Sequence, residues 1–135
     1  MEDFEEVEHT ADWAFRVRGS DLKQLFANAA GAMFELQARQ PLRPAEAVER
    51  EVEVRGFDRE TLLVNWLNEL LYLEEKQGEI YRKFDVQEIS NTQLRARVRG
   101  QRSPEAVRMI KAVTFHGLEI KQTAEGWEAT VVVDV

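Results

Sequence analysis

Apolar and polar residues alternate along several stretches of the chain, and this period of two predicts strands with one buried face. The expected strands lie at residues 13–18, 51–55, 84–89, 94–99, 112–114 with 118–121, and 127–135. In the first of them Trp13, Phe15 and Val17 form the dry face. The last is almost continuously apolar, which is typical of a strand covered on both faces.

Two longer stretches repeat apolar residues at helical spacing and carry signals at their ends. Ser20 is the expected N-cap of a helix over residues 22–36. Asp58 is the expected N-cap of a second helix, which Gly78 ends. A shorter helix start is expected at Ser103, where a capping residue precedes a proline.

We expect an α+β fold, with a mainly antiparallel or mixed β-sheet packed with two main amphipathic helices. The chain has 135 residues, close to the length of one typical domain. Residues 1–135 are therefore expected to form a single domain, large enough for a core without disulfides or structural metal.

Composition removes several classes of chemistry. The chain has no cysteine, which excludes thiol nucleophiles and thiolate metal sites and fits a cytoplasmic location. The seven glycines are too widely spaced for a glycine-rich phosphate loop. No segment is long and apolar enough to span a membrane, and the start is acidic, unlike a signal peptide. The net charge of -7 disfavours direct binding to nucleic acid by this chain alone.

Two aspartates lie at the start of the first expected strand and at the end of the last. Asp12 precedes the first strand and Asp134 closes the last, so antiparallel pairing of these strands would bring the residues within about 5 Å. The α-carboxylate of Val135 would add a third oxygen donor. Such a set suits a hard cation, Ca²⁺, Mg²⁺ or Mn²⁺, rather than zinc. The spacing alone also fits ordinary turn or cap residues.

Other polar residues have a structural and a functional interpretation. The basic row Arg95, Arg97, Arg99 and Arg102 fits either a solvated sheet face paired with glutamates or contacts to RNA phosphates. Asn68 is either a satisfied core amide or a partner-facing residue, and Glu69 is expected on the exposed side of its helix. His116 beside a glycine is more typical of a turn than of a base or metal ligand.

Four motifs together resemble the archease family: HTAD near the start, LLVNWLNELLYL in the middle, then IKAVTFHGLEI and the terminal VVVDV. The match covers the whole chain in the right order. The resemblance implies a non-catalytic accessory factor for the RtcB-type RNA ligase in tRNA splicing and RNA repair. Such a factor promotes guanylylation of the ligase by GTP and multiple turnover, and RNA is contacted only through the ligase.

The resemblance also implies a metal site. Asp12 and Asp134 correspond to the family's ligands for a divalent cation, observed there as calcium, and Val135 joins through its terminal oxygens. Two alternatives stay open from the residues. One is a small metal-dependent phosphohydrolase using Asp12, Asp134 and either His9 or His116. The other is a chaperone-like module that presents an apolar patch at 66–72 to RNA-processing proteins.

One helix position departs from the family pattern. Asn65 stands where many relatives are expected to have aspartate, which removes a charge from a face that could contact the ligase. The proposed metal ligands are not affected by this change.

Overall fold

The computed structural model describes residues 4–8, 13–37, 44–104 and 109–135, the first of these as backbone only. The described elements are β1 (Phe4–Glu8), β2 (Trp13–Gly19), α1 (Leu22–Gln37), β3 (Ala47–Arg55), α2 (Arg59–Gln77), β4 (Glu79–Ile89), β5 (Gln93–Arg102), β6 (Ala112–Thr114), β7 (Ile120–Thr123) and β8 (Gly126–Asp134). Within these residues no helix is long and apolar enough to cross a membrane.

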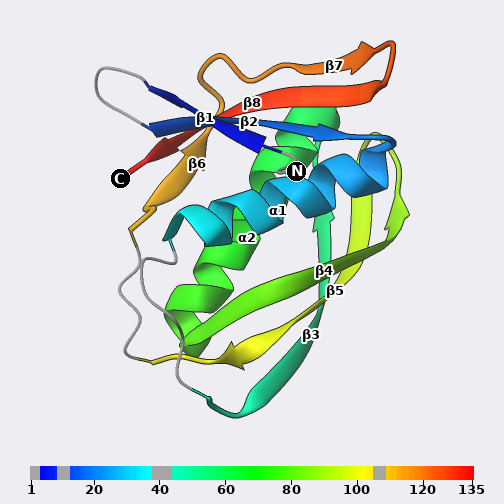
Figure 1. The fold of residues 1–135 in the computed structure, drawn as a ribbon. Helices are drawn as coiled ribbons and strands as arrows, with labels where there is room; N and C mark the ends of the chain where they lie inside the picture. Colours follow the sequence, from blue (N-terminus) through cyan, green and yellow to red (C-terminus); the bar gives the residue numbers. More distant parts are fainter. Residues whose placement is uncertain (1–3, 9–12, 38–43, 105–108) are drawn as a thin grey trace.

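The strands form two antiparallel sheets (Figure 1). One sheet has the order β3-β5-β4. In the other, β1 pairs with β2 and β2 pairs with one edge of β8. Both β6 and β7 pair with β8, at Ala112–Thr114 and Ile120–Thr123. Because β2 occupies one edge of β8, β6 and β7 share the other edge as one strand interrupted by residues 115–119.

The two helices lie between the two sheets, so each helix contributes to a common core (Figure 1). Trp66 of α2 is fully buried there and donates its indole N–H to the Phe26 carbonyl oxygen at 2.9 Å. Phe34 of α1 contacts the ring of Tyr81 edge-on and stacks with Phe84. The expected apolar patch at 66–72 is therefore mainly core, and only Tyr72 of its large hydrophobic residues is exposed.

The helix signals predicted both helices, with one correction. Asp58 caps α2 by accepting from Thr61 N–H at 2.8 Å, and Gly78 ends it in the left-handed conformation with φ of 63°. The cap of α1, however, is Asp21, whose carboxylate accepts from Gln24 N–H at 2.8 Å. The expected cap, Ser20, is one position too early, and its hydroxyl instead bonds the Gln24 side chain.

The α+β prediction is confirmed, and the differences lie at strand level. The structure divides the expected sheet into two, and β1 was not expected. β3 begins at Ala47, before the expected strand at 51–55, and β4 begins at Glu79, before the expected strand at 84–89. The last strand is covered on both faces as predicted, since Val131, Val132 and Val133 are consecutively buried. Of the short helix expected after Ser103, residues 105–108 lie outside the described residues, and Met109 and Ile110 are not helical.

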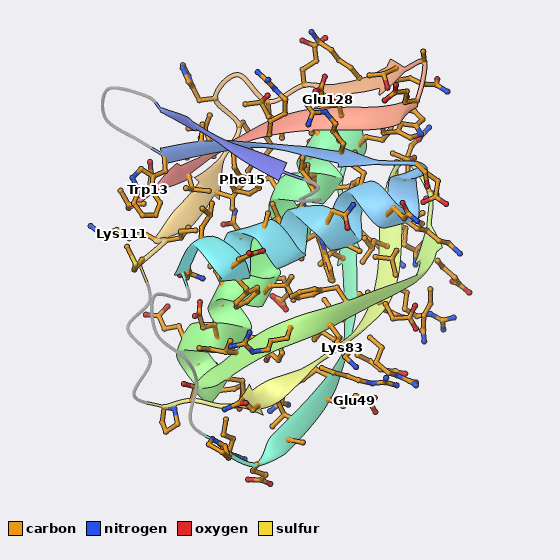
Figure 2. The ribbon with its side chains drawn as sticks, in the orientation of Figure 1. Trp13, Phe15, Glu49, Lys83, Lys111 and Glu128 are labelled. Atoms are coloured by element: carbon orange, nitrogen blue, oxygen red, sulfur yellow. The ribbon has the colours of Figure 1, made fainter. Side chains whose placement is uncertain are left out.

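Arg95, Arg97 and Arg99 of the basic row lie on the outer face of the three-stranded sheet, whereas Arg102 ends β5 in register with Glu79. All four are paired with glutamates. Figure 2 labels Glu49 and Lys83 on this face. The ion pairs are Arg95–Glu88, Arg97–Glu51, Arg99–Glu49 and Arg102–Glu46. The structural interpretation of this row as a solvated, paired face is thus confirmed. Glu53, which lies two residues after Glu51 on β3, has no ion pair among the described residues.

Candidate functional site

Polar side chains of α2 bind the free edges of both sheets. Asn68 accepts from Val113 N–H at 2.8 Å and donates to the Val113 carbonyl at 3.1 Å. Glu60 accepts from Ile120 N–H at 3.0 Å. Asn65, three residues before Asn68, donates to the Arg55 carbonyl at the end of β3 at 2.6 Å. The helix therefore occupies the place of a missing strand beside β6 and β7, and the motif LLVNWLNEL combines core residues with these bridging groups.

Asn68 is accordingly a satisfied amide, the first of the two interpretations left open by its sequence position. The side-chain amide of Gln37 has the same role for the residues just before β6. The Gln37 side-chain oxygen accepts from Met109 N–H and Ile110 N–H, each at 3.1 Å, and its amide nitrogen donates to the buried Glu74 at 3.2 Å. Gln37 has no local signal in the sequence, because the backbone partners of its side-chain oxygen, Met109 and Ile110, are more than 70 residues away.

These bonds hold the strand against which the chain ends. Lys111 N–H donates to the Asp134 carbonyl at 2.8 Å, and Ala112 is the register partner of Asp134. On the other edge of β8, Val133 is the register partner of Trp13. Figure 2 shows Trp13 and Lys111 at this same end of the sheet. The backbone of Asp134 is thus held by β6, while its side chain is exposed.

The expected antiparallel neighbourhood of the first and last strands is confirmed, with Ala14 opposite Val132 and Arg16 opposite Thr130. Side chains of β2 and β8 meet on the face that Arg16 and Thr130 share, because Arg18 forms an ion pair with Glu128 at 3.2 Å. Asp134 follows Val132 by two residues and so continues this face. Asp12 lies outside the described residues, as does His9, so their meeting with Asp134 stays a prediction.

The donors at the end of β8 fit a hard cation. Asp134 supplies an exposed carboxylate with no ion-pair partner among the described residues, and Val135 beside it is exposed as well. Carboxylate oxygens are the donors that Ca²⁺ and Mg²⁺ prefer. Among the described residues no group of three His, Cys, Asp or Glu side chains could hold a metal. A cation here would therefore depend on Asp12 to complete the set.

His116, the second histidine considered as a base or metal ligand, lies in a turn. His116 is exposed, and its backbone N–H donates to the Thr114 hydroxyl at 3.3 Å. The next residue, Gly117, has φ of 66°, which the turn requires. The turn interpretation of His116 is confirmed.

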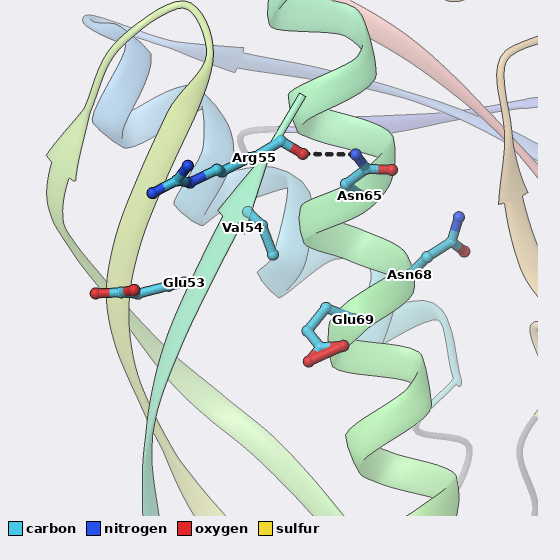
Figure 3. A pocket seen from close by; sticks show the side chains of 6 residues that line it. All are labelled: Glu53, Val54, Arg55, Asn65, Asn68 and Glu69. Atoms are coloured by element: carbon cyan, nitrogen blue, oxygen red, sulfur yellow. Dashed lines mark hydrogen bonds between the residues drawn. The ribbon is translucent and has the colours of Figure 1, made fainter. Parts of the chain in front are cut away.

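A groove of about 380 Å³ lies between β3 and α2. It is lined by Glu53, Val54, Arg55, Asn65, Asn68 and Glu69 (Figure 3). In Figure 3 the side chains of Glu53 and Arg55 point away from the helix, whereas Glu69 extends from α2 toward β3. The sequence placed Glu69 on the exposed side of the helix, and the structure places it at the border of the groove, half-buried.

A buried ion pair stabilises the three-stranded sheet at a distance from this groove. Glu79, 1% exposed, accepts two hydrogen bonds from Arg50, both at 2.8 Å, and one from the Tyr81 hydroxyl at 2.6 Å. The hydrogen bonds from Arg50 lower the pKa of the Glu79 carboxyl. Burial raises the pKa of the Tyr81 hydroxyl. Because its hydrogen-bonding partners lie within the sheet, we assign this cluster a structural role.

Comparison with known proteins places the chain in a family. The model of the archease protein family (MTH1598/TM1083) matches residues 4–135. The chain belongs to the archease family. The archease of Methanosarcina acetivorans is 42% identical over 98% of this chain and 95% of its own length. The archease of Pyrococcus abyssi is 35% identical over the full length of both chains.

Solved structures agree with this assignment. The solution structure of Methanobacterium thermoautotrophicum protein 1598 is 34% identical, covers all of both chains and superposes with a TM-score of 0.78. A crystal structure from Thermotoga maritima, described as an archease and possible chaperone, is 22% identical with a TM-score of 0.64 over 96% of this chain. The second likeness supports the archease fold, and the first supports fold and family together.

Proposed function

We propose that this archease is a non-catalytic accessory protein that activates an RtcB-type RNA ligase in tRNA splicing and RNA repair. It promotes guanylylation of the ligase by GTP and multiple turnover, and it acts in the cytoplasm. RNA is reached only through the ligase. Membership of the archease family supports this function.

The observation that carries the proposal is the exposed pair of carboxylates at the end of β8. Asp134 and Val135 lie at the end of β8 beside the start of β2, and Asp12 immediately precedes β2 in the sequence. We propose that these three residues hold a divalent cation, in the first place Ca²⁺, with Mg²⁺ and Mn²⁺ as alternatives. A bound cation there would supply positive charge for phosphate oxygens at the ligase.

The contribution of the protein is to hold the carboxylates in place. Lys111 N–H fixes the carbonyl of Asp134, and Asn68 fixes β6, the strand that immediately follows Lys111. This arrangement orients the terminus without using the acidic side chains themselves, which stay available for a cation. The net charge of -7 would steer the chain toward a positively charged site on the partner.

The test is single-turnover guanylylation of the cognate ligase with labelled GTP. We expect stimulation by the wild-type chain, loss of stimulation with Asp12→Ala or Asp134→Ala, and full stimulation with Glu125→Ala. Glu125 is an exposed glutamate in the turn before β8, at the opposite end of that strand, and so controls for the loss of one surface charge. Absence of stimulation by the wild-type chain would overturn the proposal.

The same preparation tests the phosphohydrolase alternative. The chain is incubated alone with Ca²⁺, Mg²⁺ or Mn²⁺ and a chromogenic phosphate ester. An accessory protein gives no release of phosphate above buffer. Release that Asp134→Ala abolishes would assign the carboxylates to an enzyme instead.

A further inference from the structure

The outer edge of β3 presents unpaired backbone groups. β3 is the last strand of its sheet, and among the described residues no strand pairs with its outer edge. Successive residues of a strand direct their N–H and C=O groups to opposite edges. The Arg55 carbonyl faces outward, because it accepts from Asn65, whereas Gly56 N–H faces the β5 side and donates to Thr92. The same alternation directs the backbone groups of Glu49, Glu51 and Glu53 outward.

The groove beside this edge is walled by α2 on its other side. At Glu53 and Arg55, β3 faces the groove with its backbone, because Figure 3 shows both side chains pointing away from the helix. Val54 points toward α2 and gives the groove an apolar wall. An added strand would lie about 4.8 Å from β3, over this groove.

The charges along β3 indicate which kind of peptide segment would bind at its outer edge. Along the outer face of the sheet, Glu49 and Glu51 are paired with Arg99 and Arg97. Arg95, the register partner of Glu53, is instead paired with Glu88. Glu53 therefore lacks a cation among the described residues.

Glu69 likewise has no ion-pair partner among the described residues, and its carboxylate extends toward β3 (Figure 3). The added strand would have one row of side chains beside Glu53 and the other row toward the helix and Glu69. Both rows would thus meet a carboxylate that has no ion-pair partner among the residues that the structure describes.

We propose that the outer edge of β3 binds an extended, lysine- or arginine-bearing segment of a partner protein as an additional strand. Main-chain hydrogen bonds to Glu49, Glu51 and Glu53 provide the pairing, and Glu53 and Glu69 select basic side chains. A second copy of this chain is a poor occupant, because antiparallel self-pairing of β3 places its glutamate row opposite itself. The surface is separate from the end of β8, so the inference does not depend on the proposed ligase function.

The probe is a capped seven-residue peptide of alternating lysine and threonine, compared with its glutamate and threonine counterpart. Amide hydrogen exchange of the full chain is followed by NMR with each peptide. We expect the lysine peptide to slow exchange at the amides of Glu49, Glu51 and Glu53. The amides of Arg50, Val52 and Val54, which already face β5, keep their rates. The glutamate peptide leaves all six unchanged.

Two kinds of variant separate backbone pairing from charge. Glu53→Pro removes one outward N–H, a change that an edge strand tolerates, and should abolish binding. Glu53→Gln keeps the N–H and should weaken binding only two- to fivefold, about the value of one exposed ion pair. Glu69→Gln, on the helix, should weaken binding by a similar factor. This variant keeps the proposal testable if Glu53→Pro fails to fold. Glu125→Gln is the matched control and leaves affinity unchanged.

Three results would overturn the proposal. The first is absence of binding by the lysine peptide at low ionic strength. The second is slowed exchange that does not alternate along β3, or that centres on Asp134. The third is a dimer of the chain alone in sedimentation equilibrium that Glu53→Pro dissociates, which would assign the edge to self-association.

Discussion

Asn68 illustrates at the scale of one residue how a polar side chain within an apolar helix is accommodated. Its amide uses a donor and an acceptor on the same residue of β6, Val113, and so substitutes for the backbone of a neighbouring strand. The residue is half-buried, and water would replace these bonds poorly after truncation.

We therefore expect Asn68→Ala to lower the free energy of unfolding by about 1–3 kcal/mol, because two hydrogen bonds are lost and Val113 is left without its partner. Urea denaturation measures the change. Asn65→Ala is the control, since exposed Asn65 makes a single bond to Arg55 and should cost about 1 kcal/mol or less. Equal losses for both variants would contradict the role assigned to Asn68.

The buried carboxylate of Glu79 gives a prediction about pH. Its pKa is lowered in the folded state, chiefly by the hydrogen bonds from Arg50. A lowered folded pKa stabilises the fold above the unfolded value near 4.5, and this stability is lost as pH falls through the folded pKa. Glu79→Gln should lower the free energy of unfolding at pH 7 by about 2 kcal/mol and flatten its dependence on acid pH.

The control for this prediction is a glutamate of the exposed outer face. Glu88 pairs with Arg95 where both side chains reach water, so Glu88→Gln should change stability at pH 7 by no more than about 0.5 kcal/mol. Urea denaturation from pH 3 to pH 7 compares the two variants with the wild-type chain. A Glu79→Gln curve parallel to the wild-type curve would contradict the assignment.

At the scale of elements, two glycines distinguish close packing from helix propensity. In β5, a Cβ on Gly100 would collide with the backbone of Ile80 and Tyr81 in β4, where the strand register shifts. In α1, a Cβ on Gly31 would meet nothing within 4 Å. The first glycine permits a close approach of two strands, and the second only weakens its helix.

The same substitution should thus have opposite signs at the two positions. Gly100→Ala is expected to lower the free energy of unfolding by about 1–3 kcal/mol or more, because backbone must move. Gly31→Ala is expected to raise it by about 0.5–1 kcal/mol through helix propensity. Thermal denaturation by circular dichroism compares them. A stabilised Gly100→Ala variant would mean that β4 and β5 are free to separate.

At the scale of the whole molecule, the core is complete without the end of β8. Both helices and both sheets contribute to one hydrophobic cluster, whereas Asp134 and Val135 lie outside it. A cation at the terminus would therefore stabilise the folded chain by mass action and would not be needed for folding.

Chelation should leave the circular dichroism spectrum unchanged, and added Ca²⁺ should raise the melting temperature with the logarithm of its excess over Kd. The expected gain is about 2.7 kcal/mol at a hundredfold excess. Asp134→Ala should abolish this increase, and Glu125→Ala should retain it. Unfolding on chelation would contradict the proposed division between core and site.

Local signals predicted most of the elements. Alternation over 13–18, 51–55 and 94–99 corresponds to β2, β3 and β5, and the caps Asp58 and Gly78 delimit α2. The acidic start carried no such alternation, and β1 exists because the edge of β2 pairs with it. The start of β4 was likewise missed, since Glu79 and Tyr81 enter the core only through their bonds to each other and to Arg50.

The candidate site was likewise predictable from the sequence only in part. Asp12 and Asp134 were identifiable as candidates from the motifs and from their places at the strand ends, and the pairing of β2 with β8 confirms the strand arrangement on which that prediction depends. The positioning groups were not identifiable. Asn68 lies 45 residues from Val113, Glu60 lies 60 residues from Ile120, and Arg50 lies 29 residues from Glu79.

By itself the sequence determined the two helices, the main strands and the dry faces, because each depends on periodicity or on neighbouring residues. Only the tertiary structure decided that the strands form two sheets, that β6 and β7 share one edge of β8, and that no described strand pairs with the outer edge of β3. The physical reason is that a polar side chain or a strand edge has many chemically equivalent partners along the chain. Packing of α2 between the sheets selects which of them it meets.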